Sequence, residues 1–81
     1  MTTTISNEYK TFLKSLTDEK LQKFINDALN EKERYTMRIM EAEAKRKQAT
    51  AFANMRASTD AKLTYAKELK MHRILEAEGI I

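Results

Sequence analysis

The chain of 81 residues contains one glycine and no proline, cysteine or tryptophan. A β-sandwich or barrel needs turn residues about every 8–12 positions, and the only glycine is Gly79. Without cysteine there is no disulfide framework, thiolate nucleophile or cysteine-based zinc site. The net charge is +3, and the positive charge is concentrated in residues 44–75. We therefore expect one small, basic, all-α domain.

The first expected helix spans residues 7–15 and follows a polar start at residues 1–6, which we expect to be frayed. Tyr9, Phe12 and Leu13 recur at the spacing of one helix face. The start lacks the basic and apolar segments of a signal peptide, and no apolar run reaches the ~20 residues of a membrane span. We therefore expect a cytoplasmic protein without a transmembrane segment.

A long second helix is expected over residues 18–57. Thr17 can cap it, because a threonine hydroxyl accepts a backbone N–H that the first helical turn leaves unpaired. One helix of this length would measure about 60 Å at ~1.5 Å per residue, so part of it should project from the domain or pack against another chain. The apolar stripe near its start consists of Leu21, Phe24, Ile25, Ala28 and Leu29.

The third expected helix spans residues 60–78, and Gly79 is suited to end it as the residue just beyond the last turn. Residues 58–60 offer a cap, but no glycine or proline enforces a break there, so a continuous helix is equally open. This helix is expected to dock against the other helices through one broad apolar face, which consists of Leu63, Ala66, Met71, Ile74 and Leu75. Because residues 61–75 are basic and amphipathic, attachment to a membrane surface stays open as well.

No set of side chains in the sequence suggests catalysis. His72 is the only histidine, and Glu68, one helical turn before it, would give at most two ligands of a metal site. The serines have no histidine at a suggestive spacing, and a single glycine cannot form a phosphate-binding loop. We therefore expect a non-enzymatic protein with no catalytic residues, no cofactor and no metal.

The long helix and a second apolar stripe along it favour a regulatory protein that acts by binding another protein. This second stripe consists of Met37, Met40, Ala44, Ala51 and Met55. A single small core cannot cover both stripes, and the methionines favour adaptable packing. A helical homo-oligomer would use the same surface. The positions expected at such an interface are Tyr35, Met37, Met40, Phe52 and Met55.

The alternative is a basic helical regulator that binds nucleic acid. Lys45, Arg46 and Lys47 form the one basic run, and Arg56 follows at a distance along the chain. Such binding would be driven by phosphate contacts and would weaken strongly with salt. No aromatic residues interleave the basic ones as base stacking would require, so a solvated helix surface explains the run as well.

The chain begins with the polar run Met1-Thr-Thr-Thr-Ile5-Ser6-Asn7-Glu8-Tyr9-Lys10, and its helices are rich in lysine and glutamate. In these features and in length it resembles the small accessory proteins of T-even-type bacteriophages. Among them it is most similar to the cytoplasmic lysis-inhibition proteins of the rapid-lysis group, which are accessory antiholins. The resemblance implies a protein of the host cytoplasm that binds the cytosolic N-terminal part of the phage holin and delays lysis together with a periplasmic antiholin. It assigns a role to no individual residue.

Overall fold

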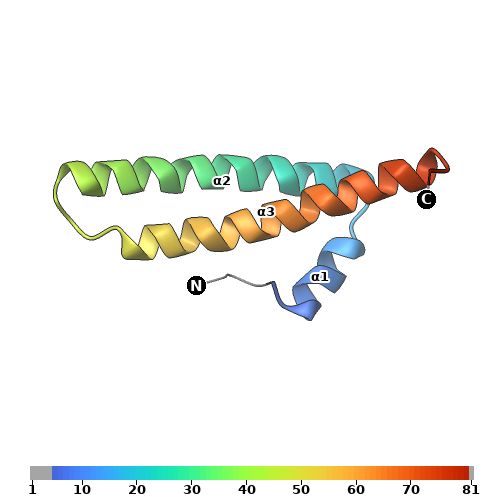
Figure 1. Ribbon diagram of the computed structural model, residues 1–81, viewed down its shortest axis with the longest axis horizontal. Helices are drawn as coiled ribbons and strands as arrows, with labels where there is room; N and C mark the ends of the chain where they lie inside the picture. Colours follow the sequence, from blue (N-terminus) through green and yellow to red (C-terminus); the bar gives the residue numbers. More distant parts are fainter. Residues whose placement is uncertain (1–4, 81) are drawn as a thin grey trace.

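The computed structural model describes residues 5–80, which form three helices and no strand: α1 (Asn7–Lys14), α2 (Asp18–Ala44) and α3 (Thr50–Ala77). α2 and α3 lie side by side as an antiparallel helical hairpin, and α1 packs beside the half of the hairpin that is remote from its turn (Figure 1). The molecule is elongated, measuring 52 × 21 × 19 Å. The expected all-α fold with a short first helix is confirmed.

Two side-chain caps fix the starts of α1 and α2. The Ser6 hydroxyl accepts a hydrogen bond from the backbone N–H of Tyr9 at 3.2 Å, and the Thr17 hydroxyl accepts one from the N–H of Lys20 at 3.3 Å. Each cap satisfies one N–H that has no partner within its helix. The predicted boundary at Thr17 is therefore confirmed, whereas most of the start expected to be frayed, residues 1–4, lies outside the described part of the chain.

The long helix predicted over residues 18–57 is wrong, because α2 ends at Ala44 and α3 begins at Thr50. The predicted third helix over residues 60–78 is wrong at its start for the same reason. Its expected cap lies inside α3, where Thr59 is buried against α2. Folding back at residues 45–49 lets two apolar stripes bury each other, and this gain outweighs the helix propensity of the run.

The end of α2 has the hydrogen bonds of a Schellman motif. Arg46 adopts a left-handed conformation with φ of +56°, its N–H bonds to the carbonyl of Glu43 at 3.0 Å, and the N–H of Lys47 bonds to the carbonyl of Ala42 at 2.8 Å. Gly79, with φ of +75°, ends α3 in the same way, as the sequence predicts. At the end of α2 an arginine takes the position that glycine usually fills.

The register of the hairpin is set by polar pairs that step up one helix and down the other. One of these pairs is the ion pair between Lys32 and Asp60, in which Nζ lies 2.7 Å from Oδ1. In each pair the two residues lie at about equal distances along the chain from the turn. The pairs are Asp18–Arg73, Gln22–Lys70, Lys32–Asp60 and Thr36–Arg56.

The apolar core is concentrated away from the turn. We call residues 18–30 and 59–77 the base half of the hairpin, and residues 31–58, with the turn, the tip half. Leu13 of α1 is fully buried, and α1 lies beside the base half (Figure 1). In the tip half Ile39 is the only buried apolar side chain. The core cluster of the base half consists of Leu21, Ile25, Ala28, Leu63 and Ala66.

We predict that Arg46→Gly stabilises the protein. A non-glycine residue in the left-handed region costs on the order of 1 kcal/mol, and glycine avoids that cost. The free energy of unfolding from urea titrations should rise by about 0.5–1 kcal/mol. Lys47→Gly is the matched control, because Lys47 has no positive φ, and it should give no gain. Equal effects of the two substitutions would contradict this explanation of the turn.

Candidate functional site

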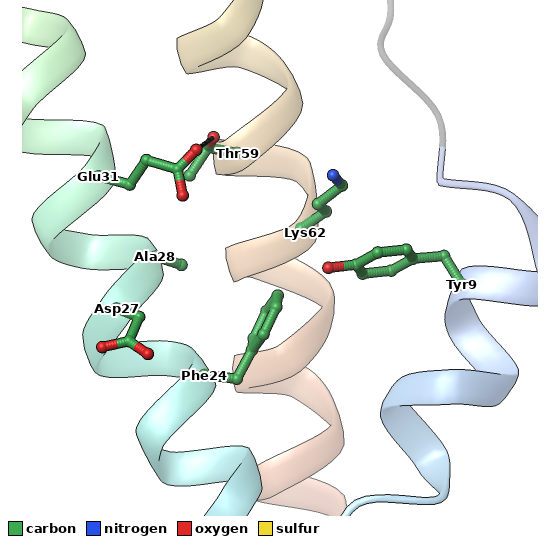
Figure 2. A pocket seen from close by; sticks show the side chains of 7 residues that line it. All are labelled: Tyr9, Phe24, Asp27, Ala28, Glu31, Thr59 and Lys62. Atoms are coloured by element: carbon green, nitrogen blue, oxygen red, sulfur yellow. Dashed lines mark hydrogen bonds between the residues drawn. The ribbon is translucent and has the colours of Figure 1, made fainter.

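One face of the hairpin carries a groove between α2 and α3, and Tyr9 of α1 lines this groove in the base half only. The ring of Tyr9 in α1 lies 6.2 Å from the ring of Phe24 in α2, measured between centroids. The Lys62 ammonium of α3 lies 4.7 Å from the centre of the Tyr9 ring, a cation–π contact. Tyr9 therefore contacts both long helices, and it points from α1 toward the hairpin in Figure 2.

A small cavity of about 100 Å³ remains where α1 meets the hairpin (Figure 2). Thr59 donates a hydrogen bond from its hydroxyl to Oε1 of Glu31 at 3.3 Å, across the interface of α3 and α2. This bond satisfies the one buried polar side chain of the hairpin. The cavity is lined by Tyr9, Phe24, Asp27, Ala28, Glu31, Thr59 and Lys62.

Beyond Glu31 the groove continues into the tip half, where α1 no longer covers it (Figure 1). This open part encloses about 290 Å³ and is lined by Glu31, Arg34, Tyr35, Arg38 and Phe52. Tyr35 and Phe52 are half-buried, so each presents part of its ring to solvent. Two aromatic side chains and two arginines thus meet in a concave surface, and we take this tip-half groove as the candidate functional site.

Burial of the Tyr35 phenol raises its pKa, and a hydrogen bond to Glu31 and the charge of that carboxylate raise it further, although the positive charge of Arg34 opposes them. The phenol is therefore neutral at physiological pH and faces a carboxylate. The groove thus offers aromatic rings for apolar contacts and a phenol and two guanidinium groups for hydrogen bonds.

The structure divides the five predicted interface residues. Phe52 and Tyr35 line the groove together, and Met55, one turn beyond Phe52 on α3, is half exposed at 50%. Met37 and Met40 are exposed at 70% and 65%, but they lie about 200° and 140° around α2 from Tyr35. Three of the five positions thus share one side of the hairpin, and the other two face elsewhere.

The predicted basic patch is also divided. Lys45, Arg46 and Lys47 are exposed in the turn at the tip of the hairpin. The Lys45 ammonium pairs with Glu41 at 3.2 Å. Arg56 lies about 9 Å along α3 from its first residue, and its guanidinium reaches the Thr36 hydroxyl at 3.5 Å. Three basic residues are therefore close together, and the fourth helps to join the two helices.

Arg34, Arg38 and Glu31 were not predicted as site residues. Their signal in the sequence is their spacing of three and four residues, which places them along one edge of α2 beside Tyr35. That edge becomes the wall of a groove only because α3 folds back onto α2. The predicted single helix over residues 18–57 has no such groove.

Two further features concern metal and membrane binding. Within residues 5–80 no three histidine or acidic side chains are grouped as metal ligands, and His72 lies near Glu76, at 3.9 Å between Nδ1 and Oε1. None of the helices in this range combines the length and the apolar character needed to cross a bilayer.

Comparisons of the chain with known protein families, with curated proteins and with solved structures found no match.

We predict that Tyr9→Phe flattens the dependence of stability on alkaline pH. Burial, and then the Glu31 carboxylate, raise the pKa of the Tyr9 phenol above its ordinary value of 10.0. The folded chain therefore holds the phenol proton more tightly than the unfolded chain, and this stabilisation is present below pH about 10 and lost as the pH rises through the folded-state pKa. Urea unfolding at pH about 9 and about 11 measures it. Equal losses in the variant and the wild type would contradict the assignment.

Proposed function

We propose that this protein is a non-enzymatic regulatory module that binds another protein through the tip-half groove. The observation that carries the proposal is the unequal covering of the hairpin, because α1 lies against the base half, where Tyr9 lines the groove, and does not reach the tip half. The open part presents Tyr35 and Phe52, and aromatic side chains are enriched at protein interfaces.

The way in which α1 packs on the hairpin indicates how a partner helix could bind. α1 has eight residues, too few for a stable isolated helix, yet packing on the hairpin buries its Leu13 completely. A partner helix laid along the tip half would bury Tyr35, Phe52 and Met55 in the same manner. It would also strengthen the half of the hairpin that has only Ile39 as a buried apolar residue.

The partner that we propose is the cytosolic N-terminal part of a phage holin, and the protein would then act in the host cytoplasm as an accessory antiholin. This finer assignment rests on the resemblance of the sequence to the lysis-inhibition proteins. A groove open to a short helical segment is compatible with that role, since holding a holin segment would keep it from assembling with others. Self-association through the same groove is the competing use.

Binding of nucleic acid is the second candidate function. It is favoured by the position of Lys45, Arg46 and Lys47, which the fold gathers at the exposed tip. A turn of this kind can approach phosphates more readily than three residues spread around a helix. The affinity would then fall steeply with salt and would not depend on the groove.

We predict that Met55→Gln weakens binding of the holin's cytosolic part about fivefold or more, because a polar amide would replace a thioether in the buried interface. Met71→Gln is the matched control. Met71 also lies on α3 and is similarly exposed, at 56% against 50%, but it is in the base half. Isothermal titration with the full chain measures both affinities, and circular dichroism checks that both variants fold.

Equal affinities of the two variants for the holin segment would contradict the assignment of the groove. A dimer of the free protein that only Met55→Gln dissociates would assign the groove to self-association. Binding of duplex DNA that falls with salt and is lost on replacing Lys45 and Lys47, in the absence of holin binding, would favour the second candidate function.

A further inference from the structure

We infer that the occupant of the tip-half groove is an acidic amphipathic helix, which places two carboxylates one turn apart against Arg34 and Arg38 and an apolar side chain between Tyr35 and Phe52. The inference rests on the proposed function, since it names the chemistry of the partner at the same site. It follows from the charge and the length of the two walls of the groove.

The wall formed by α2 carries two positively charged side chains. Arg34 and Arg38 both line the groove and are four residues apart, so they are neighbours on one edge of α2. Arg34 forms no ion pair with any residue in the described range 5–80. Arg38 pairs with Glu41 only at 3.8 Å, with both side chains more than half exposed. Such a pair contributes little to stability and can be exchanged for a better partner.

The negative charge in the groove is already engaged. Glu31 accepts the hydrogen bond of Thr59 and lies beside the Tyr35 phenol. It sits at the end of the open groove nearest α1, where it also borders the smaller cavity. The part of the groove that a partner would fill is therefore bounded by arginine on the α2 side.

The wall formed by α3 is apolar where it lines the groove. Its lining residue is Phe52, and Met55 is exposed one turn further along. Arg56 is the one charged residue among residues 50–58, and its guanidinium is directed to the Thr36 hydroxyl of α2. The α2 wall is therefore complementary to carboxylates of a partner, and the α3 wall is complementary to its apolar side chains. An amphipathic helix with an acidic edge beside its apolar face matches both, because residues three and four apart on a helix share an edge.

The length of the open groove corresponds to about two turns of a partner helix. Its lining residues on α2 run from Glu31 to Arg38, which is about 10 Å at ~1.5 Å per residue. A peptide of about 14 residues would supply these two turns with about one further turn at each end, the length at which an isolated helix begins to form. Arginine is suited to this contact, since its planar guanidinium can donate two hydrogen bonds to one carboxylate.

The experiment uses two synthetic peptides of about 14 residues. Both are amphipathic helices with the same apolar face, but one carries two glutamates four residues apart on the edge of that face and the other carries two lysines. Fluorescence anisotropy measures their binding to the full-length wild type, to Arg34→Glu/Arg38→Glu and to Lys45→Glu/Lys47→Glu. The last variant is the matched control, because it changes the net charge by the same amount at the turn.

We expect the wild type to bind the glutamate peptide in preference to the lysine peptide. The groove variant should bind the glutamate peptide about tenfold or more weakly and should gain affinity for the lysine peptide. The turn variant should change either affinity by less than about threefold, because screening limits the effect of distant exposed charges. Equal losses in the two variants, or equal binding of the two peptides by the wild type, would overturn the inference.

Two comparisons separate this inference from the proposed function. If the holin segment loses affinity on Met55→Gln but not on Arg34→Glu/Arg38→Glu, the groove binds protein and the acidic helix is the wrong occupant. If the glutamate peptide binds as expected while the holin segment does not, the inference stands and the holin assignment fails. Displacement of the bound glutamate peptide by duplex DNA or by anionic vesicles, through Arg34 and Arg38, would overturn the choice of a helix.

Discussion

The antiparallel contact between α2 and α3 is the interaction on which the rest of the molecule depends, and it is apolar over only half of its length. Leu21, Ile25 and Leu63 belong to the core cluster of the base half. Toward the turn, Ile39 and polar pairs such as Lys32–Asp60 hold the helices together. Such pairs are partly exposed and add little stability, so local opening should be easiest at the tip.

This unequal distribution of apolar contacts is the structural basis of the proposed function. α1 adds its Leu13 to the half that is already well packed, and the groove of the tip half stays open. A helix bound there would bury the exposed parts of Tyr35 and Phe52 and would place its charges against arginines that the protein's own carboxylates hold only weakly. A partner helix would therefore add apolar contacts to the tip half, which has few of its own, and its binding would stabilise the folded protein.

The sequence predicts the starts of α1 and α2 and the end of α3 well, because their causes are local. Thr17 caps a helix by its own hydroxyl, and Gly79 adopts a positive φ at no steric cost. The turn at Arg46 could not be predicted from such signals, since a good helix former takes the left-handed position when the packing of α3 on α2 repays the strain. Three of the predicted interface positions lie on one side of the hairpin, but which three depends on where the chain folds back, and the same is true of the two arginines in the groove.

The fold-back at Arg46 creates the groove, and a distance across the hairpin tests it most directly. The chain has no native cysteine, so spin labels can be attached to Glu33→Cys and Ala57→Cys, two exposed positions on α2 and α3. Packed helices lie about 8–10 Å apart between axes, and we expect a label separation below about 25 Å by pulsed electron paramagnetic resonance. A separation near the ~36 Å of one continuous helix would contradict the hairpin and the groove with it.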